Sequence, residues 1–228
     1  MLLMSKLNVV KLGIVEYGKA YQLQKRLLLE HIEGRGTNSL LLLQHNPVIT
    51  IGRNGSRSNV LATGSELADA GIDIHEIDRG GDVTYHGPGQ LTGYPIIDLR
   101  CFKKDIHWYL RQLEEVIIKV LAEYGIAGRK VEGYTGVWVG DEKVAAIGIA
   151  IRRWITYHGL ALNVNPDMSH FGMITPCGIT DKGVTSLEKL LLHKVDMDEV
   201  VNRIAFAFAE VFDVDPEFAS FPKGEIEI

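Results

Sequence analysis

Apolar residues recur at helical spacing in three stretches of the chain. Leucine and alanine positions repeat every three or four residues over about 16–33, which predicts an amphipathic helix there. A second pattern predicts a helix that begins after Asp105, a suitable N-cap, and ends before Gly125, a suitable C-cap. A third pattern predicts a helix over about 197–212.

Short apolar runs lie between these helices and predict strands. Gly140, Asp141 and Glu142 separate two such runs, so the tract 136–151 is predicted to be a β-hairpin. Strands joined by hairpins, with few helices between them, favour an α+β fold with a mixed, largely antiparallel sheet and packed helices. The predicted strands are 8–14, 39–44, 48–52, 72–77, 91–98, 136–139, 143–151 and 155–164.

The composition is that of a soluble globular chain. Of its 228 residues, 46% are hydrophobic and 23% are charged, close to the usual averages. We find no linker-like tract and expect one domain over residues 1–228. The apolar runs are far shorter than the about 20 residues that span a bilayer, and the first residues lack the features of a targeting segment. We therefore expect a cytoplasmic protein, and the net charge of −5 disfavours binding to nucleic acid or a membrane surface.

Glycine is in excess: 24 of the 228 residues are glycine, whereas the usual share of about 7% would give about 16. Five glycines lie in the window 79–93, RGGDVTYHGPGQLTG. Such a backbone can approach a ligand closely, although a turn-rich connection between strands would have the same composition. A dinucleotide fingerprint is excluded, because Thr92 stands where its third glycine is required. The polar residues of the window include Arg79, Thr84, His86 and Gln90.

Two cysteines form neither a CxxC motif nor a disulfide framework. Cys177 lies between proline and glycine in the loop-like stretch 165–183, which makes it a candidate nucleophile, although a buried structural thiol is the alternative. Cys101 is expected to be such a structural thiol. Lys143 precedes an apolar run, so its amine is either held in a dry site or solvated at the hairpin turn.

Several separated motifs over about 40–190 resemble, in order, those of the lipoyl(octanoyl) transferases. Members of that family move an octanoyl group from acyl carrier protein to lipoyl domains, and their fold is that of the biotin/lipoate protein ligase-like catalytic domain. The motifs are QHNPV from Gln44 with Gly52, RGGDVTYHGPGQ from Arg79 with Tyr94, KVAAIG from Lys143, HGLALN from His158 and PCGI from Pro176.

The resemblance implies one acyltransferase catalytic domain over 1–228, which uses no cofactor and no metal. It implies that Cys177 is the nucleophile and carries an acyl thioester, while Lys143 lowers the thiol pKa and acts as general acid and base. The octanoyl group would then pass to a lysine ε-amine, the first step of endogenous protein lipoylation. The implied substrate-binding residues are Arg79, Gly80, Gly81, Asp82, Val83, Thr84, Tyr85, His86, Ala146, Ile147, Gly148, Gly159, Leu160 and Ala161.

The implied partners are octanoyl-acyl carrier protein as donor, and lipoyl domains of 2-oxoacid dehydrogenases and the glycine cleavage H protein as acceptors. These partners are usually acidic, as this chain is, so docking would require a local basic patch. The backbone N–H groups of Gly81 or of residues 146–148 are candidate oxyanion donors. The candidate basic residues, each of which is otherwise an ordinary solvated side chain, are Arg53, Arg57, Arg79, Lys130, Arg152 and Arg153.

Three other functions are compatible with parts of this pattern. An ATP-dependent lipoate or biotin protein ligase of the same fold would need no nucleophilic cysteine, so Cys177 counts against it. A non-catalytic acyl-binding or lipoyl-domain-binding module would not require Cys177 together with Lys143. A stand-alone cysteine hydrolase would not preserve the acyl-cysteine for an amine. The residues whose role stays open, as supports of the dyad or as hydrogen-bonded core residues, are His45, His86 and His158.

Overall fold

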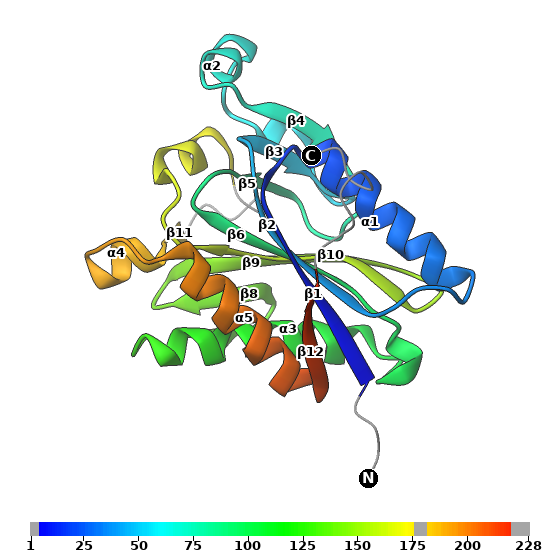
Figure 1. The fold of residues 1–228 in the computed structure, drawn as a ribbon. Helices are drawn as coiled ribbons and strands as arrows, with labels where there is room; N and C mark the ends of the chain where they lie inside the picture. Colours follow the sequence, from blue (N-terminus) through cyan, green and yellow to red (C-terminus); the bar gives the residue numbers. More distant parts are fainter. Residues whose placement is uncertain (1–4, 176–181, 220–228) are drawn as a thin grey trace.

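The fold is built around one large mixed sheet (Figure 1). The computed structural model describes residues 5–175 and 182–219, so Cys177 lies outside the described residues. Strand β1 is parallel to both of its neighbours, while the other long strands pair antiparallel. The predicted mixed, largely antiparallel sheet with packed helices is confirmed. In order across the sheet, the strands are β12 (Val214–Ala219), β1 (Ser5–Val15), β2 (Ser39–His45), β6 (Gln90–Ile96), β10 (Ile155–Asn163), β9 (Glu142–Arg152), β8 (Tyr134–Val139) and β7 (Arg129–Val131).

A second, three-stranded sheet was not predicted. It has the order β4 (Asp73–Glu76), β3 (Val48–Ile51), β5 (Val83–His86), and helix α2 (Gly64–Asp69) follows β3. The ranges 48–52 and 72–77 were predicted as strands, but local pattern does not say which sheet a strand joins. Strand β5 was missed because its four residues lie between glycine pairs, which hide the apolar pattern.

The three predicted helices are confirmed as α1 (Tyr17–Ile32), α3 (Ile106–Glu123) and α5 (Met197–Phe212). The carboxylate of Asp105 accepts the Trp108 N–H at 3.0 Å and caps α3. Short elements were not predicted, because one or two turns show no clear period. They are α2, α4 (Leu187–Leu191), β7, β11 (Gly183–Val184) and the 3₁₀ turns η1 (Arg57–Asn59), η2 (Leu99–Cys101) and η3 (Met168–Met173). Strand β12 was not predicted either.

The two faces of the large sheet carry different helices. Helices α3 and α5 pack on one face and α1 on the other (Figure 1). Strand β2 shows why its leucine run is continuous: Leu40 and Leu42 belong to the core under α3 and α5, whereas Leu41 and Leu43 belong to the core under α1. A strand buried on both faces needs apolar residues at every position. Within the described part of the chain, every helix is too short or too polar to cross a membrane.

Candidate active site

A cavity of about 470 Å³ lies where the loop between β4 and β5, residues 77–82, meets strands β9 and β10. Its volume is in the range of small-molecule sites, about 300–1,000 Å³. Lys143 and every predicted substrate-binding residue except Tyr85 line it. Sequence reasoning did not assign the lining residues Tyr17, Asn54, Thr92, Tyr94, Leu110, Gly133, Tyr134, Thr135, Ile149 and His158 to the binding site.

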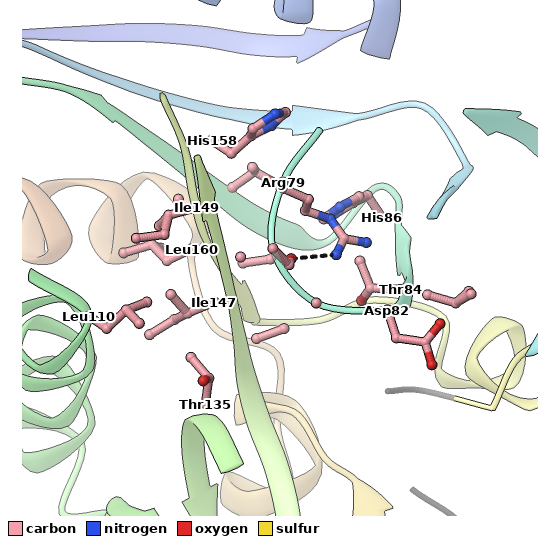
Figure 2. Close-up of a pocket in the computed structure, with 18 of the residues that line it drawn as sticks. Arg79, Asp82, Thr84, His86, Leu110, Thr135, Ile147, Ile149, His158 and Leu160 are labelled. Atoms are coloured by element: carbon pink, nitrogen blue, oxygen red, sulfur yellow. Dashed lines mark hydrogen bonds between the residues drawn. The ribbon is translucent and has the colours of Figure 1, made fainter. Parts of the chain in front are cut away.

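The floor of the cavity is made of small residues on neighbouring strands. Ala146 of β9 pairs with Ala161 of β10, and Gly148 pairs with Gly159. A Cβ added to Gly148 would lie 2.9 Å from the carbonyl oxygen of Gly80, so only glycine lets the β4–β5 loop approach this closely. Figure 2 shows Leu110, Ile147, Ile149 and Leu160 on one side of the strands, and Arg79, Thr84 and His86 on the other.

Arg79 fixes the β4–β5 loop from inside. It is 7% exposed, and its guanidinium donates to the carbonyl and the hydroxyl of Thr50 at 2.8 and 2.9 Å and to the Gly80 carbonyl at 3.1 Å (Figure 2). The Gly80 N–H donates to the Ile149 carbonyl at 2.8 Å, which ties the loop to β9. The expectation that Arg79 is part of a docking patch is therefore wrong, because its charge is buried in the fold.

Asp78, which sequence reasoning missed, holds the same loop from outside. Its carboxylate accepts hydrogen bonds from the hydroxyls of Tyr21 and Tyr157 and the amine of Lys25, each at 2.7 Å, and from His158 Nε2 at 3.0 Å. Burial alone would raise the pKa of Asp78, but these hydrogen bonds outweigh it and hold the pKa well below the ordinary value. The carboxylate therefore fastens the loop to α1 and β10.

A continuous hydrogen-bonded chain runs beneath the cavity toward Lys143. His86 Nδ1 donates to Gln90 Oε1 at 2.7 Å, and Gln90 Nε2 donates to Asn163 Oδ1 at 2.9 Å. Asn163 Nδ2 donates to the carbonyl of Thr185 at 3.0 Å. The backbone N–H of Thr185 in turn donates to the Lys143 carbonyl at 3.0 Å. Because the Gln90 amide nitrogen donates elsewhere, its oxygen is the acceptor and fixes the His86 tautomer. Burial lowers the pKa of His86 to about 3, so the ring is neutral.

The other two histidines are also buried and hydrogen-bonded. His45 Nδ1 donates to the Val15 carbonyl at 2.9 Å, and the hydroxyl of Tyr94 donates to Nε2 at 2.7 Å. Burial lowers the pKa of His45 to about 4 and also lowers that of His158. His158 lines the cavity, but His45 lies behind its wall. These contacts are those of hydrogen-bonded core residues.

Lys143 lies at the start of β9 and is buried, with 8% exposure. Its Nζ lies 4.8 Å from the ring centroid of Trp138, in cation–π contact. Val184 of β11 pairs with Lys143, so the chain returns beside this lysine just after the undescribed stretch 176–181. Of the two alternatives open from the sequence, a dry site and a solvated turn, the structure shows the dry site.

Two further expectations, for Tyr85 and Cys101, need correction. Tyr85 does not line the cavity: it packs against Phe171, with ring centroids 5.5 Å apart, because alternation along β5 turns it away from the face of Thr84 and His86. Cys101 is exposed at the end of η2 and is not a buried thiol.

The predicted basic residues do not form one patch. Lys130 is paired with Glu115 at 2.9 Å, and Arg152 lies at the opposite end of β9 from Lys143. Arg53 adjoins Asn54, which lines the cavity, and its N–H donates to the Arg79 carbonyl at 3.0 Å. Arg53 is therefore placed near the cavity. Within residues 5–175 and 182–219, no three histidine, cysteine, aspartate or glutamate side chains are grouped to hold a metal ion.

Solved structures with this fold include lipoate and biotin protein ligases. A bi-partite lipoate protein ligase from Thermoplasma acidophilum has a TM-score of 0.69 and 17% identity, and the match covers 96% of this chain and 88% of that one. Lipoate-protein ligase A bound with ATP has a TM-score of 0.73 and 17% identity, over 97% and 90%. A biotin protein ligase from Aquifex aeolicus has a TM-score of 0.55 and 15% identity, over 91% and 70%. This likeness shows the fold.

The chain belongs to the lipoyl protein ligase A/B catalytic domain family, whose model matches residues 16–209. The octanoyltransferase of Caldicellulosiruptor saccharolyticus is 54% identical over 217 residues, which are 94% of this chain and 92% of that protein. The octanoyltransferase of Desulforamulus reducens is 46% identical over 213 residues, 93% of each chain. The family and the fold implied by the sequence motifs are thereby confirmed.

Proposed function

We propose that this chain transfers an octanoyl group from octanoyl-acyl carrier protein to a lysine ε-amine of a lipoyl domain, through a thioester on Cys177. The octanoyltransferases named above, at 46% and 54% identity, support the transfer reaction. One observation carries the site assignment: the buried Lys143 lines a cavity, and the residues of the cavity floor are small enough to leave room for a linear chain. The ATP-dependent ligases share the fold at only 15–17% identity.

The cavity floor suits an alkyl chain laid along β9 and β10. From Lys143, the floor continues through the pair Ala146 and Ala161 to the pair Gly148 and Gly159. The thioester end would lie at Lys143 and the methyl end near the glycines. Each buried methylene contributes about 0.8 kcal/mol, so the methylenes of an octanoyl chain would contribute about 5 kcal/mol in total.

The nucleophile in this proposal is Cys177, and the described residues after it support its partnership with Lys143. Val184, seven positions further along the chain, pairs with Lys143 in β11. An ammonium beside a thiol favours the thiolate, and lowering the thiol pKa by about two units from about 8.5 would make about three-quarters of it anionic at pH 7. That fraction is enough for an efficient nucleophile.

The reaction takes two displacements. The Cys177 thiolate forms a bond to the carbonyl carbon of the donor thioester, the bond to the pantetheine sulfur breaks, and Lys143 gives its proton to the departing thiolate. The lipoyl-domain amine then attacks the acyl-cysteine, neutral Lys143 takes the amine proton, and Cys177 leaves as a thiolate. A thioester and an amine become a thiol and an amide, which is downhill and needs no ATP.

The test is intact-protein mass spectrometry after incubation with octanoyl-acyl carrier protein in the absence of ATP. We expect an octanoyl adduct that is discharged when a lipoyl domain is added. Cys101→Ala, which changes the exposed second cysteine, is the matched control and should keep the adduct. No adduct on the native chain, or an adduct that persists in Cys177→Ala, would exclude the covalent mechanism, and turnover that depends on ATP would favour a ligase.

A further inference from the structure

A β-bulge decides which way Lys143 points. Trp138 of β8 pairs with Lys143, while the preceding Val137 pairs with Ala145, so Val144 is the extra residue. Val144 and Ala145 consequently both belong to the core under α3, and Lys143 lies on the other face, beside Trp138. In a regular strand, Lys143 would share a face with Ala145 and Ile147, which belong to that core.

The bulge depends on Gly136 in the opposite strand. Gly136 has φ +121°, and a Cβ there would lie 2.5 Å from the Ala145 carbonyl oxygen. Its N–H does not join the ladder with β9 but donates to Oε1 of Glu114, on helix α3, at 3.1 Å. A buried N–H that leaves a ladder needs another acceptor. Glu114 supplies it from the neighbouring layer.

Glu114 is an acidic residue buried among apolar side chains. It is 1% exposed on the face of α3 that also buries Leu113 and Ile117. Its Oε2 accepts a hydrogen bond from the half-exposed Arg111 at 2.6 Å. A buried carboxylate is costly to desolvate, and an apolar side chain would suit the surroundings of Glu114 better. The presence of an acid here is explained by its bond to Gly136.

We infer that Glu114 is a positioning residue: by accepting the Gly136 N–H it holds the bulge, and the bulge holds the Lys143 amine at the reacting end of the cavity. The inference rests on the proposed function for the role of Lys143, but its structural half does not. The path runs from α3 through β8 to β9, and Glu114 is not among the residues that line the cavity.

Glu114→Met tests this inference, because methionine has similar length, suits an apolar site and accepts no such hydrogen bond. Misplacement by about 1 Å can cost about 100-fold in rate, so we expect single-turnover acylation to fall by roughly 10- to 100-fold with little change in KM for the donor. The pH profile of Cys177 alkylation in Glu114→Met should move to higher pH, because the displaced amine lowers the thiol pKa less. Glu114→Gln keeps an oxygen acceptor and should stay within about threefold of the native rate. Glu115→Ala, on the exposed side of α3, is the matched control.

A second measurement does not depend on acyl transfer. Pulse labelling with an amine-reactive reagent, read by mass spectrometry, should modify Lys143 faster in Glu114→Met than in the native chain, Glu114→Gln or Glu115→Ala. Unchanged labelling and an unchanged rate in folded Glu114→Met would overturn the inference, as would an equal loss in Glu114→Gln. Faster Lys143 labelling in Glu114→Met, together with a native chain that forms no acyl adduct, would instead contradict the proposed function and keep the positioning role.

Discussion

The two faces of strands β9 and β10 carry side chains of different size. Under α3 and α5 the side chains are large and apolar, and they fill the space between sheet and helices. Toward the β4–β5 loop the same strands present Ala146, Gly148, Gly159 and Ala161, and a cavity remains. Ile147, Ile149 and Leu160 of that core also reach the cavity, but residues deeper under α3, such as Ile117, do not. Changes at these deep core positions and changes on the cavity floor should therefore be separable by experiment.

The largest expected effect is that of Lys143→Ala on the cavity face. General acid and base groups contribute about 10²- to 10⁴-fold, so single-turnover acylation by octanoyl-acyl carrier protein should fall by about that factor, while the thermal midpoint changes little. Lys189→Ala removes an exposed lysine that pairs with Glu142 at 2.6 Å and should leave the rate unchanged.

The opposite face provides the contrast to this prediction. Ile117→Ala removes a fully buried side chain of α3 and should lower the unfolding free energy by about 2–5 kcal/mol, measured by denaturant titration. The rate per folded molecule should be native. A large loss of rate in folded Ile117→Ala, or native rates in Lys143→Ala, would show that the two faces are not separate in function.

An intermediate effect is expected when alanines on the two faces of β9 and β10 are enlarged. Ala161→Val narrows the cavity, and losing room for two methylenes at about 0.8 kcal/mol each should shift selectivity from octanoyl toward hexanoyl donors by roughly tenfold. Ala145→Val enlarges a residue in the core under α3 and should lower stability by overpacking, with selectivity unchanged. Competition between the two donors gives the selectivity, and equal shifts in both variants would contradict the assignment of the floor.

The smallest expected effect concerns pH and His45, behind the cavity wall. Its pKa is about 4 in the folded chain and about 6.5 when unfolded. Between these values only the unfolded state binds the proton, so His45 reduces stability by about 1.4 kcal/mol for each pH unit as the pH falls from 6.5 toward 4. Glutamine supplies the same donor and acceptor without titrating. His45→Gln should therefore lose less stability than the native chain over this window, and parallel denaturation curves would exclude the assigned protonation state.

Local pattern was sufficient for the long elements of this fold. Periodicity and caps predicted α1, α3 and α5, and a glycine-acidic turn predicted the β8–β9 hairpin. Each of these signals is contained in a short stretch of neighbouring residues, so local sequence is enough to recognise it. The pairing of β1 with β12 joins the two ends of the chain, and no local signal encodes it.

The site divides in the same way. Glycine and polar residues in the 79–93 window pointed to a binding segment, and the family motifs named most of its lining. Asp78 was overlooked although it directly precedes the Arg-Gly-Gly motif, because its four donors come from α1 and β10. Glu114 looks like one more acid on an amphipathic helix until Gly136 is placed opposite it.

The β4–β5 loop joins two strands of the small sheet, whereas the cavity floor belongs to the large one. An acyl chain between them would touch both sheets and would bind only when both are formed. Such a ligand adds to the free energy of unfolding in proportion to its preference for the folded state. The thermal midpoint of the acyl-bound protein should therefore be higher than that of the free protein, because the acyl chain adds apolar contacts between the two sheets.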